Sequence, residues 1–201
     1  QVVVDDVRLA LGRLAAVWRK QFNQPVIGLT GSNGKTTLKE MLTAILVQQG
    51  QTLSTVGNLN NDIGMPLTLL RLRAADAFAV IEMGANHFGE IDYLTQIACP
   101  DVAILNNAGA AHLEGFGDIA GVARAKGEIF SGLTADGVAV INADDAYADY
   151  WRGLNAQRRV VTFGMAQAAD IQGRVDAGNQ FIIRVGAVEM PVNLKLLGRH
   201  N

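Results

Sequence analysis

Short apolar runs alternate along the chain with stretches whose apolar residues recur at helical spacing. The first pattern is typical of buried strands, and the second is typical of helices that cover a sheet with one face. The alternation predicts an α/β fold, a mainly parallel sheet with helices on both faces. We expect strands at residues 26–29, 78–82, 102–106, 138–142 and 160–163, and helices at residues 6–20, 36–49, 66–72, 90–98 and 119–133.

The two ends of the chain depart from this pattern. The first predicted helix carries an apolar face of Val7, Leu11, Leu14 and Trp18. From Asp170 onward, short apolar segments at residues 171–175, 180–185 and 188–194 are separated by Gly178-Asn179 and Gly186-Ala187, which are hairpin signals. We therefore expect a small antiparallel β addition over residues 170–195.

Composition narrows the class of protein. Hydrophobic residues make up 49% of the 201 residues and charged residues 18%, as in an ordinary globular domain. The net charge of -2 and the scattered basic residues give no reason to expect nucleic acid as a partner. The single cysteine, Cys99, excludes an internal disulfide and suits a reducing compartment. With no bilayer-length apolar run, we expect a cytoplasmic protein without membrane insertion.

Residues 26–37, VIGLTGSNGKTT, join an apolar run to a helical pattern through a glycine-rich turn. Backbone N–H groups of such a turn can point at phosphate oxygens, while Lys35 reaches the β- and γ-phosphates and Thr36 binds magnesium. The general phosphate-loop pattern has glycine where Leu29 stands, so a chance glycine-rich turn is the alternative. The predicted triphosphate site consists of Gly31, Ser32, Asn33, Gly34, Lys35, Thr36 and Thr37.

Polar residues follow several predicted strands, where ligands of an α/β sheet bind. Glu82 ends the strand at residues 78–82 and could hold magnesium, or it could cap the next loop. The loop at residues 57–64 brings together Asn58, Asn60 and Asn61, which could face a ligand or could only shape the turn before Pro66.

His112 and Lys126 are the other two candidates for chemistry. A histidine such as His112 is atypical for magnesium, which prefers oxygen, so it could be purely structural. Lys126 falls on the apolar stripe of its predicted helix. It could extend its amine to water while its stem covers the core, or it could hold the amine in a desolvated site where the pKa falls and the neutral form reacts with carbon dioxide.

Six ordered blocks resemble the ATP-dependent Mur ligase family over nearly the whole chain: TGSNGKT, GNLNNDIGMPLTLL, VIEMGANHFGEI, AAHLEGFG, ARAKGEIFSGL and GRHN. The family spelling TGxxGKT accounts for the unusual glycine positions. The resemblance implies that residues 1–24 end an N-terminal domain and that residues 25–201 form the central ATP-binding domain. It also implies a piece of a longer polypeptide, because the uridine-nucleotide domain and the C-terminal domain are largely absent.

The resemblance implies a role for each candidate. Lys35 would neutralise the β- and γ-phosphates of ATP, and Thr36 and Glu82 would hold a first magnesium ion. His112 would help bind a second metal, and Lys126 would become carbamylated and offer oxygen to it. Asn58, Asn60 and Asn61 would line the phosphate and metal side. His200 and Asn201 would lie near adenine and ribose.

The implied reaction adds D-alanyl-D-alanine to UDP-N-acetylmuramoyl-tripeptide through an acyl phosphate in peptidoglycan precursor synthesis, by a monomeric enzyme. The blocks GNLNNDIGMP and GANHFGEI favour this reaction. The alternatives are a sibling or folylpolyglutamate-synthase-like ligase that adds one amino acid, a nucleotide-switch or motor protein, and a nucleotide-binding module. The fragment alone is expected to be inactive.

Overall fold

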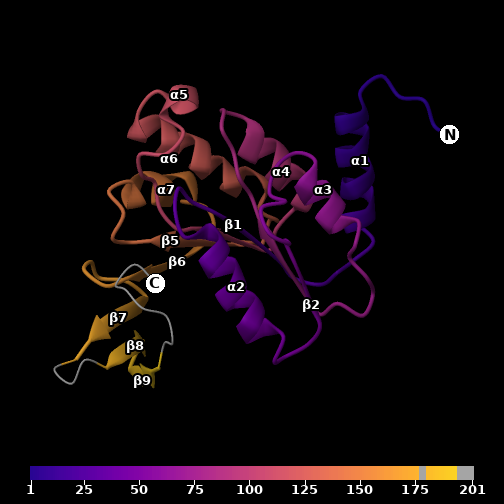
Figure 1. Cartoon of the computed structure of the whole chain (residues 1–201). Coiled ribbons are helices and arrows are strands. Elements are labelled where there is room, and N and C mark those ends of the chain that lie inside the picture. The colour runs from indigo at the N-terminus through magenta and orange to yellow at the C-terminus, as the bar shows by residue number, and fades with distance from the viewer. Residues whose placement is uncertain (177–179, 194–201) are drawn as a thin grey trace.

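The computed structural model describes residues 1–176 and 180–193, which form one nine-stranded sheet with helices on both faces (Figure 1). The helices are α1 (Val7–Arg19), α2 (Lys35–Leu46), α3 (Gly64–Leu69), α4 (Glu90–Ala98), α5 (Leu113–Phe116), α6 (Ile119–Gly127) and α7 (Ala148–Leu154), and a 3-10 helix, η1 (Glu128–Gly132), follows α6. The strands are β1 (Val26–Thr30), β2 (Thr52–Ser54), β3 (Phe78–Glu82), β4 (Val102–Leu105), β5 (Val138–Asn142), β6 (Arg159–Gly164), β7 (Ile171–Val175), β8 (Phe181–Val185) and β9 (Val188–Val192).

The strand order is β2-β3-β1-β4-β5-β6-β7-β8-β9, parallel from β2 to β7 and antiparallel from β7 to β9. Leu29 of β1 lies opposite Glu82 of β3 and Ile104 of β4. The carboxyl ends of these three central strands therefore meet at one edge, which brings the segments that follow them together.

Two apolar layers cover the two faces of the sheet. On one face Ile27, Leu29 and Val80 pack against Leu38 and Leu42 of α2. On the other face, a larger cluster joins the sheet to α3, α4, α6 and α7, and includes Ile81, Leu105, Val122 and the fully buried Trp151. The predicted fold class, with its antiparallel addition, is confirmed. The addition continues the main sheet through β6 and β7.

The first helix forms as expected, but it packs through a different face from the one predicted. Val7 and Leu14 are exposed, whereas Gly12 and Ala15 are buried. A Cβ atom at Gly12 would lie only 2.9 Å from Cδ1 of Ile97 and would clash with the Tyr93 hydroxyl, so glycine permits α1 to approach α4 closely.

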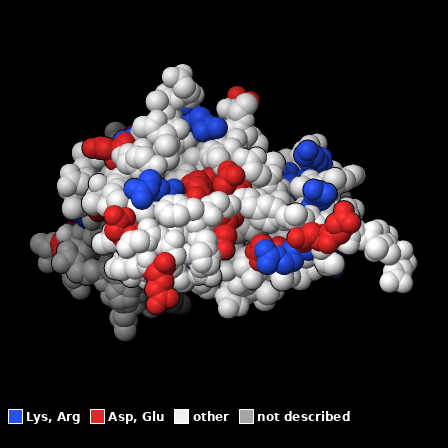
Figure 2. All heavy atoms as spheres, turned by 90° about the horizontal axis from the view of Figure 1, so that it is seen from above, with Lys and Arg blue, Asp and Glu red and all other residues white. Residues whose placement is uncertain are grey.

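Three elements of the structure, β2, α5 and α7, were not predicted from the sequence. The predicted helix at residues 119–133 is divided into α6 and η1. No helix among the described residues is long and apolar enough to cross a membrane. On the face shown in Figure 2, basic and acidic side chains are interspersed.

Candidate active site

The glycine-rich turn lies between β1 and α2, with the first turn of α2 directly behind it. Gly34 has a left-handed backbone (φ 74°), and a Cβ atom there would lie 3.1 Å from Nδ2 of Asn106, so this position needs glycine. Lys35 folds back over the turn and donates from Nζ to the carbonyls of Gly31 (2.8 Å) and Ser32 (3.3 Å). Burial lowers the pKa of Lys35, and the charge of Glu82 opposes this effect.

The residues that follow β4 hold this turn in place. Oδ1 of Asn107 accepts the N–H of Asn33 at 3.0 Å, and the side-chain amides of Asn106 and Asn107 both donate to the Asn33 carbonyl. The N–H of Ser32 donates to the Asn107 carbonyl at 3.0 Å, and Oγ of Ser32 exchanges hydrogen bonds with the backbone of Gly109. The segment that follows β4 therefore fixes the turn through these hydrogen bonds.

Glu82 is 1% exposed and lies at the end of β3, where it receives two side chains. Oγ1 of Thr36 donates to Oε2 at 3.1 Å, and Nδ2 of Asn60 donates to Oε1 at 2.7 Å. A hydroxyl and a carboxylate side by side are oxygen donors of the kind that magnesium prefers, so these residues fit the ion. Among the described residues, no group of three or more His, Cys, Asp or Glu side chains converges on one point, so phosphate or water oxygens would complete such a site.

A buried lysine, Lys39, supports this corner and was not among the predicted site residues. Its Nζ donates to the Thr55 carbonyl at 2.7 Å and pairs with Oε1 of Glu40 at 2.7 Å. Oγ1 of Thr55 in turn accepts the N–H of Glu82 at 3.0 Å. Lys39 stands four residues after Lys35 and so shares its helix face, a spacing that could have identified it from the sequence.

The three asparagines after β2 have different environments. Asn60 binds Glu82, whereas Oδ1 of Asn61 accepts the N–H groups of Ile63 (3.3 Å) and Gly64 (2.8 Å) and so shapes the entry to α3. The side-chain oxygen of Asn61 is therefore used in shaping the turn before α3. All three asparagines, Asn58 included, line a cavity of about 590 Å³.

The same cavity brings together Lys35, His112 and Lys126. Lys126 is 1% exposed, which excludes the alternative in which its amine extends into bulk water. Its Nζ lies 5.6 Å from the centre of the Phe116 ring. Burial, together with the charge of Lys35, lowers the pKa of Lys126 to about 8. A substantial fraction of this amine is therefore neutral near pH 8.

His112 is an exposed residue with a left-handed backbone (φ 54°) directly before α5. Such a conformation is uncommon for a residue other than glycine, and His112 lies at the wall of the cavity. His200 and Asn201, expected near adenine, lie outside the described residues.

A glycine-rich turn between a parallel strand and a helix, followed by Lys-Thr and facing a strand-end carboxylate, defines a nucleotide-binding α/β protein of the phosphate-loop class. The chain also matches the family model described as Mur ligase middle domain over residues 29–201. It belongs to the Mur ligase family.

Curated relatives match the full length of this chain. It is 49% identical to UDP-N-acetylmuramoyl-tripeptide--D-alanyl-D-alanine ligase of Escherichia coli (strain K12), with 100% of this chain and 46% of that protein covered. It is 46% identical to the ligase of the same name from Haemophilus influenzae, with 100% and 45% covered. The chain thus spans slightly less than half the length of these relatives.

Solved structures agree with the fold. A MurF crystal structure from Acinetobacter baumannii superposes with a TM-score of 0.93 at 42% identity, covering 100% of this chain and 45% of that one. A second structure from this organism (TM-score 0.91, 41% identity, the same coverage) is titled as the ligase of UDP-N-acetylmuramoylalanyl-D-glutamyl-2,6-diaminopimelate with D-alanyl-D-alanine. MurF ligase from Thermotoga maritima in complex with ADP gives a TM-score of 0.84 at 32% identity, with 95% and 45% covered.

Proposed function

We propose that this chain is the ATP-binding part of a ligase that adds D-alanyl-D-alanine to UDP-N-acetylmuramoyl-tripeptide in peptidoglycan precursor synthesis. The observation that carries the proposal is the buried amine of Lys126 in one cavity with Lys35 of the phosphate loop. The relatives at 46–49% identity, which are named for this reaction, support it. Folylpolyglutamate-type structures match at 12–14% identity and support only the shared fold.

The chemical problem in such a reaction is the approach of a carboxylate to a triphosphate. The ammonium of Lys35 and the N–H groups of residues 34–37, at the start of α2, would offset the repulsion between the two anions and fix their alignment. Thr36 and Glu82 would hold magnesium, which supplies further positive charge at the phosphates. Asn58, Asn60 and Asn61 border the same space.

Lys126 is proposed to act as a carbamate. Its neutral amine would add to carbon dioxide and release one proton, which leaves an oxygen-bearing anion suited to a second metal ion. The burial that lowers the pKa of the amine supplies the neutral form that this addition needs. His112, on the same cavity, would complete that metal site.

With these groups in place, an oxygen of the tripeptide carboxylate attacks the γ-phosphorus of ATP, and the bond to ADP breaks. The amine of the dipeptide then attacks the carbonyl carbon of the acyl phosphate, a proton leaves the nitrogen, and phosphate departs as the amide forms. An acyl phosphate hydrolyses in water, so the reaction needs a closed site. His200 and Asn201 are proposed for the adenine side, and a cytoplasmic monomer is the form proposed.

The test is a reaction of the full-length protein with ATP, magnesium, tripeptide precursor and D-alanyl-D-alanine. Phosphate release should require both substrates. Mass spectrometry should show a product heavier than the tripeptide precursor by the mass of the dipeptide less one water. Addition of a single amino acid would support a sibling ligase instead. Phosphate release without either substrate would contradict ligation and favour a nucleotide switch.

A further inference from the structure

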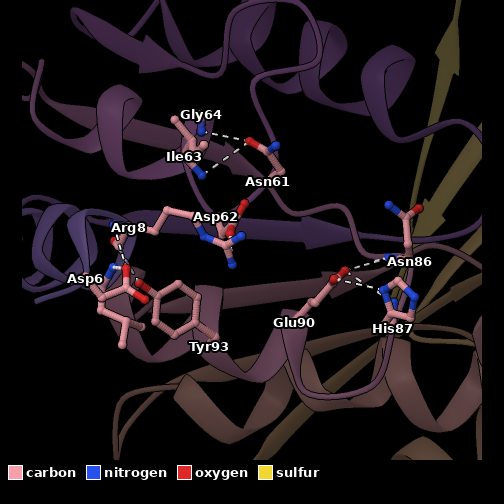
Figure 3. A network of polar contacts seen from close by, with 11 residues as sticks. Asp6, Arg8, Asn61, Asp62, Ile63, Gly64, Asn86, His87, Glu90 and Tyr93 are labelled. Carbon is pink, nitrogen blue, oxygen red and sulfur yellow. Dashed lines mark hydrogen bonds and ion pairs between the residues drawn. The ribbon is translucent and has the colours of Figure 1, made fainter.

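Two carboxylates that the proposed chemistry does not use, Glu90 and Glu128, hold the segment that follows β3. We call this segment, residues 84–89, the wall segment. It lines the cavity through Gly84, Ala85, Asn86, Phe88 and Gly89. Glu90 binds one half of it, since its Oε2 accepts the N–H groups of Asn86 (2.7 Å) and His87 (3.2 Å) (Figure 3).

Glu128 binds the other half from a different part of the chain. It is the first residue of η1, two positions after Lys126, and its carboxylate accepts the N–H of Gly89 at 2.9 and 3.1 Å and that of Asp92 at 3.2 Å. Gly89 is the N-cap of α4 and has no side chain to accept these N–H groups, so Glu128 takes the place of a capping side chain. It thereby ties the wall segment to the helical segment that carries Lys126.

The wall segment contacts the residues that enclose the Lys126 amine. The rings of Phe88 and Phe116 meet edge to face with centroids 5.4 Å apart, and Nζ of Lys126 lies over the Phe116 ring at 5.6 Å. A Cβ atom at Gly115 would clash with the Asn86 carbonyl, so α5 also lies close against the wall segment. Phe116 and Lys126 are both buried, and displacement of the wall segment would open a route from water to the amine.

Other contacts join α4 to η1 without Glu128. Oγ1 of Thr95 donates to the Ile129 carbonyl at 2.8 Å, and the Ser131 hydroxyl donates to the carboxylate of Asp92. These contacts hold the two helices together when the carboxylate of Glu128 is removed. The effect of its removal should therefore be confined to the first turn of α4 and the wall segment.

We propose that Glu128 is a positioning residue that holds the wall segment closed over Lys126 and so keeps bulk water from its amine. The chemical consequence rests on the proposed function, in which this amine carries a carbamate. Loss of the carbamate places a proton on its nitrogen, breaks the bond between nitrogen and carbon, and releases carbon dioxide. Exclusion of water slows the delivery of that proton and so prolongs the life of the carbamate.

The experiment measures the rate at which acetic anhydride acylates Lys126 in the full-length protein at pH 8, in buffer depleted of carbon dioxide, by mass spectrometry of peptides. Glu128→Ala should raise this rate by about tenfold, as expected when a charge-assisted hydrogen bond that opposes local opening is lost. The rate at the equally buried Lys39 should not change. Asp92→Asn, which removes a carboxylate from the same contact between α4 and η1, is the matched control and should leave both rates unaltered.

A change of charge alone cannot give this result. The pKa of Lys126 is about 8, so its amine is already about half neutral at pH 8, and removal of a nearby anion could raise the rate by no more than about twofold. Phe88→Ala, at a half-exposed position, opens the same route with no change of charge and should also raise the rate severalfold. An increase of twofold or less in Glu128→Ala, an equal increase in Asp92→Asn, or no increase in Phe88→Ala would overturn the inference.

A second measurement follows the carbamate itself. Carbon NMR of protein loaded with isotopically labelled bicarbonate should show a carbamate signal that decays faster in Glu128→Ala after transfer to unlabelled bicarbonate. The kcat that this variant loses should return in excess bicarbonate with KM for ATP unchanged, a rescue that a purely structural role would not give. The acylation rates need neither carbamate nor turnover, so a protein that forms no amide would refute the proposed function while these rates still decide the inference.

Discussion

The buried amine of Lys126 should make the stability of the chain depend on pH in a specific window. Its pKa in the fold is about 8, against an ordinary value of 10.5, because burial and the charge of Lys35 disfavour the protonated form. Between these two pH values the unfolded chain binds the proton and the folded chain does not, so the free energy of unfolding rises with pH. Each pH unit is worth roughly 1.4 kcal/mol, so the full gain is about 3 kcal/mol.

The assay is urea unfolding from pH 7 to pH 11 in buffers depleted of carbon dioxide, for the chain and for Lys126→Met. Subtracting the variant removes the contributions of other groups that titrate in this range, such as Tyr93, whose pKa is raised by burial. The difference in unfolding free energy should be constant below about pH 8, rise by about 3 kcal/mol and become constant again above 10.5. Lys20→Met, at an exposed position, controls for the loss of a lysine.

A flat difference between the chain and Lys126→Met across this range would refute the reasoning, because it would mean that folding leaves the affinity of the amine for a proton unaltered. A fall with rising pH would show that the fold favours the cation. Either result would contradict the claim that burial lowers the pKa of Lys126 and so supplies a neutral, reactive amine.

Three further substitutions test other parts of the site and core. Gly34→Ala should reduce the free energy of unfolding by about 1–2 kcal/mol in urea titration, because its backbone is left-handed, and should weaken nucleotide binding in calorimetry. Lys39→Met should raise the magnesium concentration needed for half-maximal activity of the full-length protein by about tenfold, since it frees the backbone of Thr55, whose hydroxyl binds the N–H of Glu82. Glu40→Gln is its control, and equal effects would contradict this role. Trp151→Phe should cost about 2 kcal/mol in thermal or urea unfolding by removing its 3.0 Å hydrogen bond to a backbone carbonyl of α6, and a change below 0.5 kcal/mol would argue against that bond.

Much of the fold was readable from the sequence because local patterns and the global arrangement agree. The apolar runs of the central strands are buried on both faces, so they stand out without alternation, and each is followed by a helical pattern. Because ligands bind at the carboxyl ends of strands, the position of Glu82 predicted a site residue. Lys126 was predicted because it is a charged residue on the apolar stripe of its helix.

The features that were missed depend on tertiary contacts with little local signal. β2 has only three residues, which is too short for a pattern to be distinguished from a loop. The packing face of α1 is set by Gly12, whose lack of a side chain admits α4, and hydrophobicity alone favours the larger residues on the opposite side. Gly89 and Glu128 are 39 positions apart in the sequence, and only the fold shows that they are hydrogen-bonded.

The asparagine contacts to the glycine-rich turn have an energetic consequence. Asn106 and Asn107, which follow the neighbouring strand β4, fix the backbone at Asn33 through hydrogen bonds within the protein. The loss of conformational entropy that ordering such a turn entails is thus met when the chain folds, at about 1–2 kcal/mol per residue. A triphosphate that binds this turn need not order the backbone at Asn33, so that part of the entropic cost does not reduce its affinity.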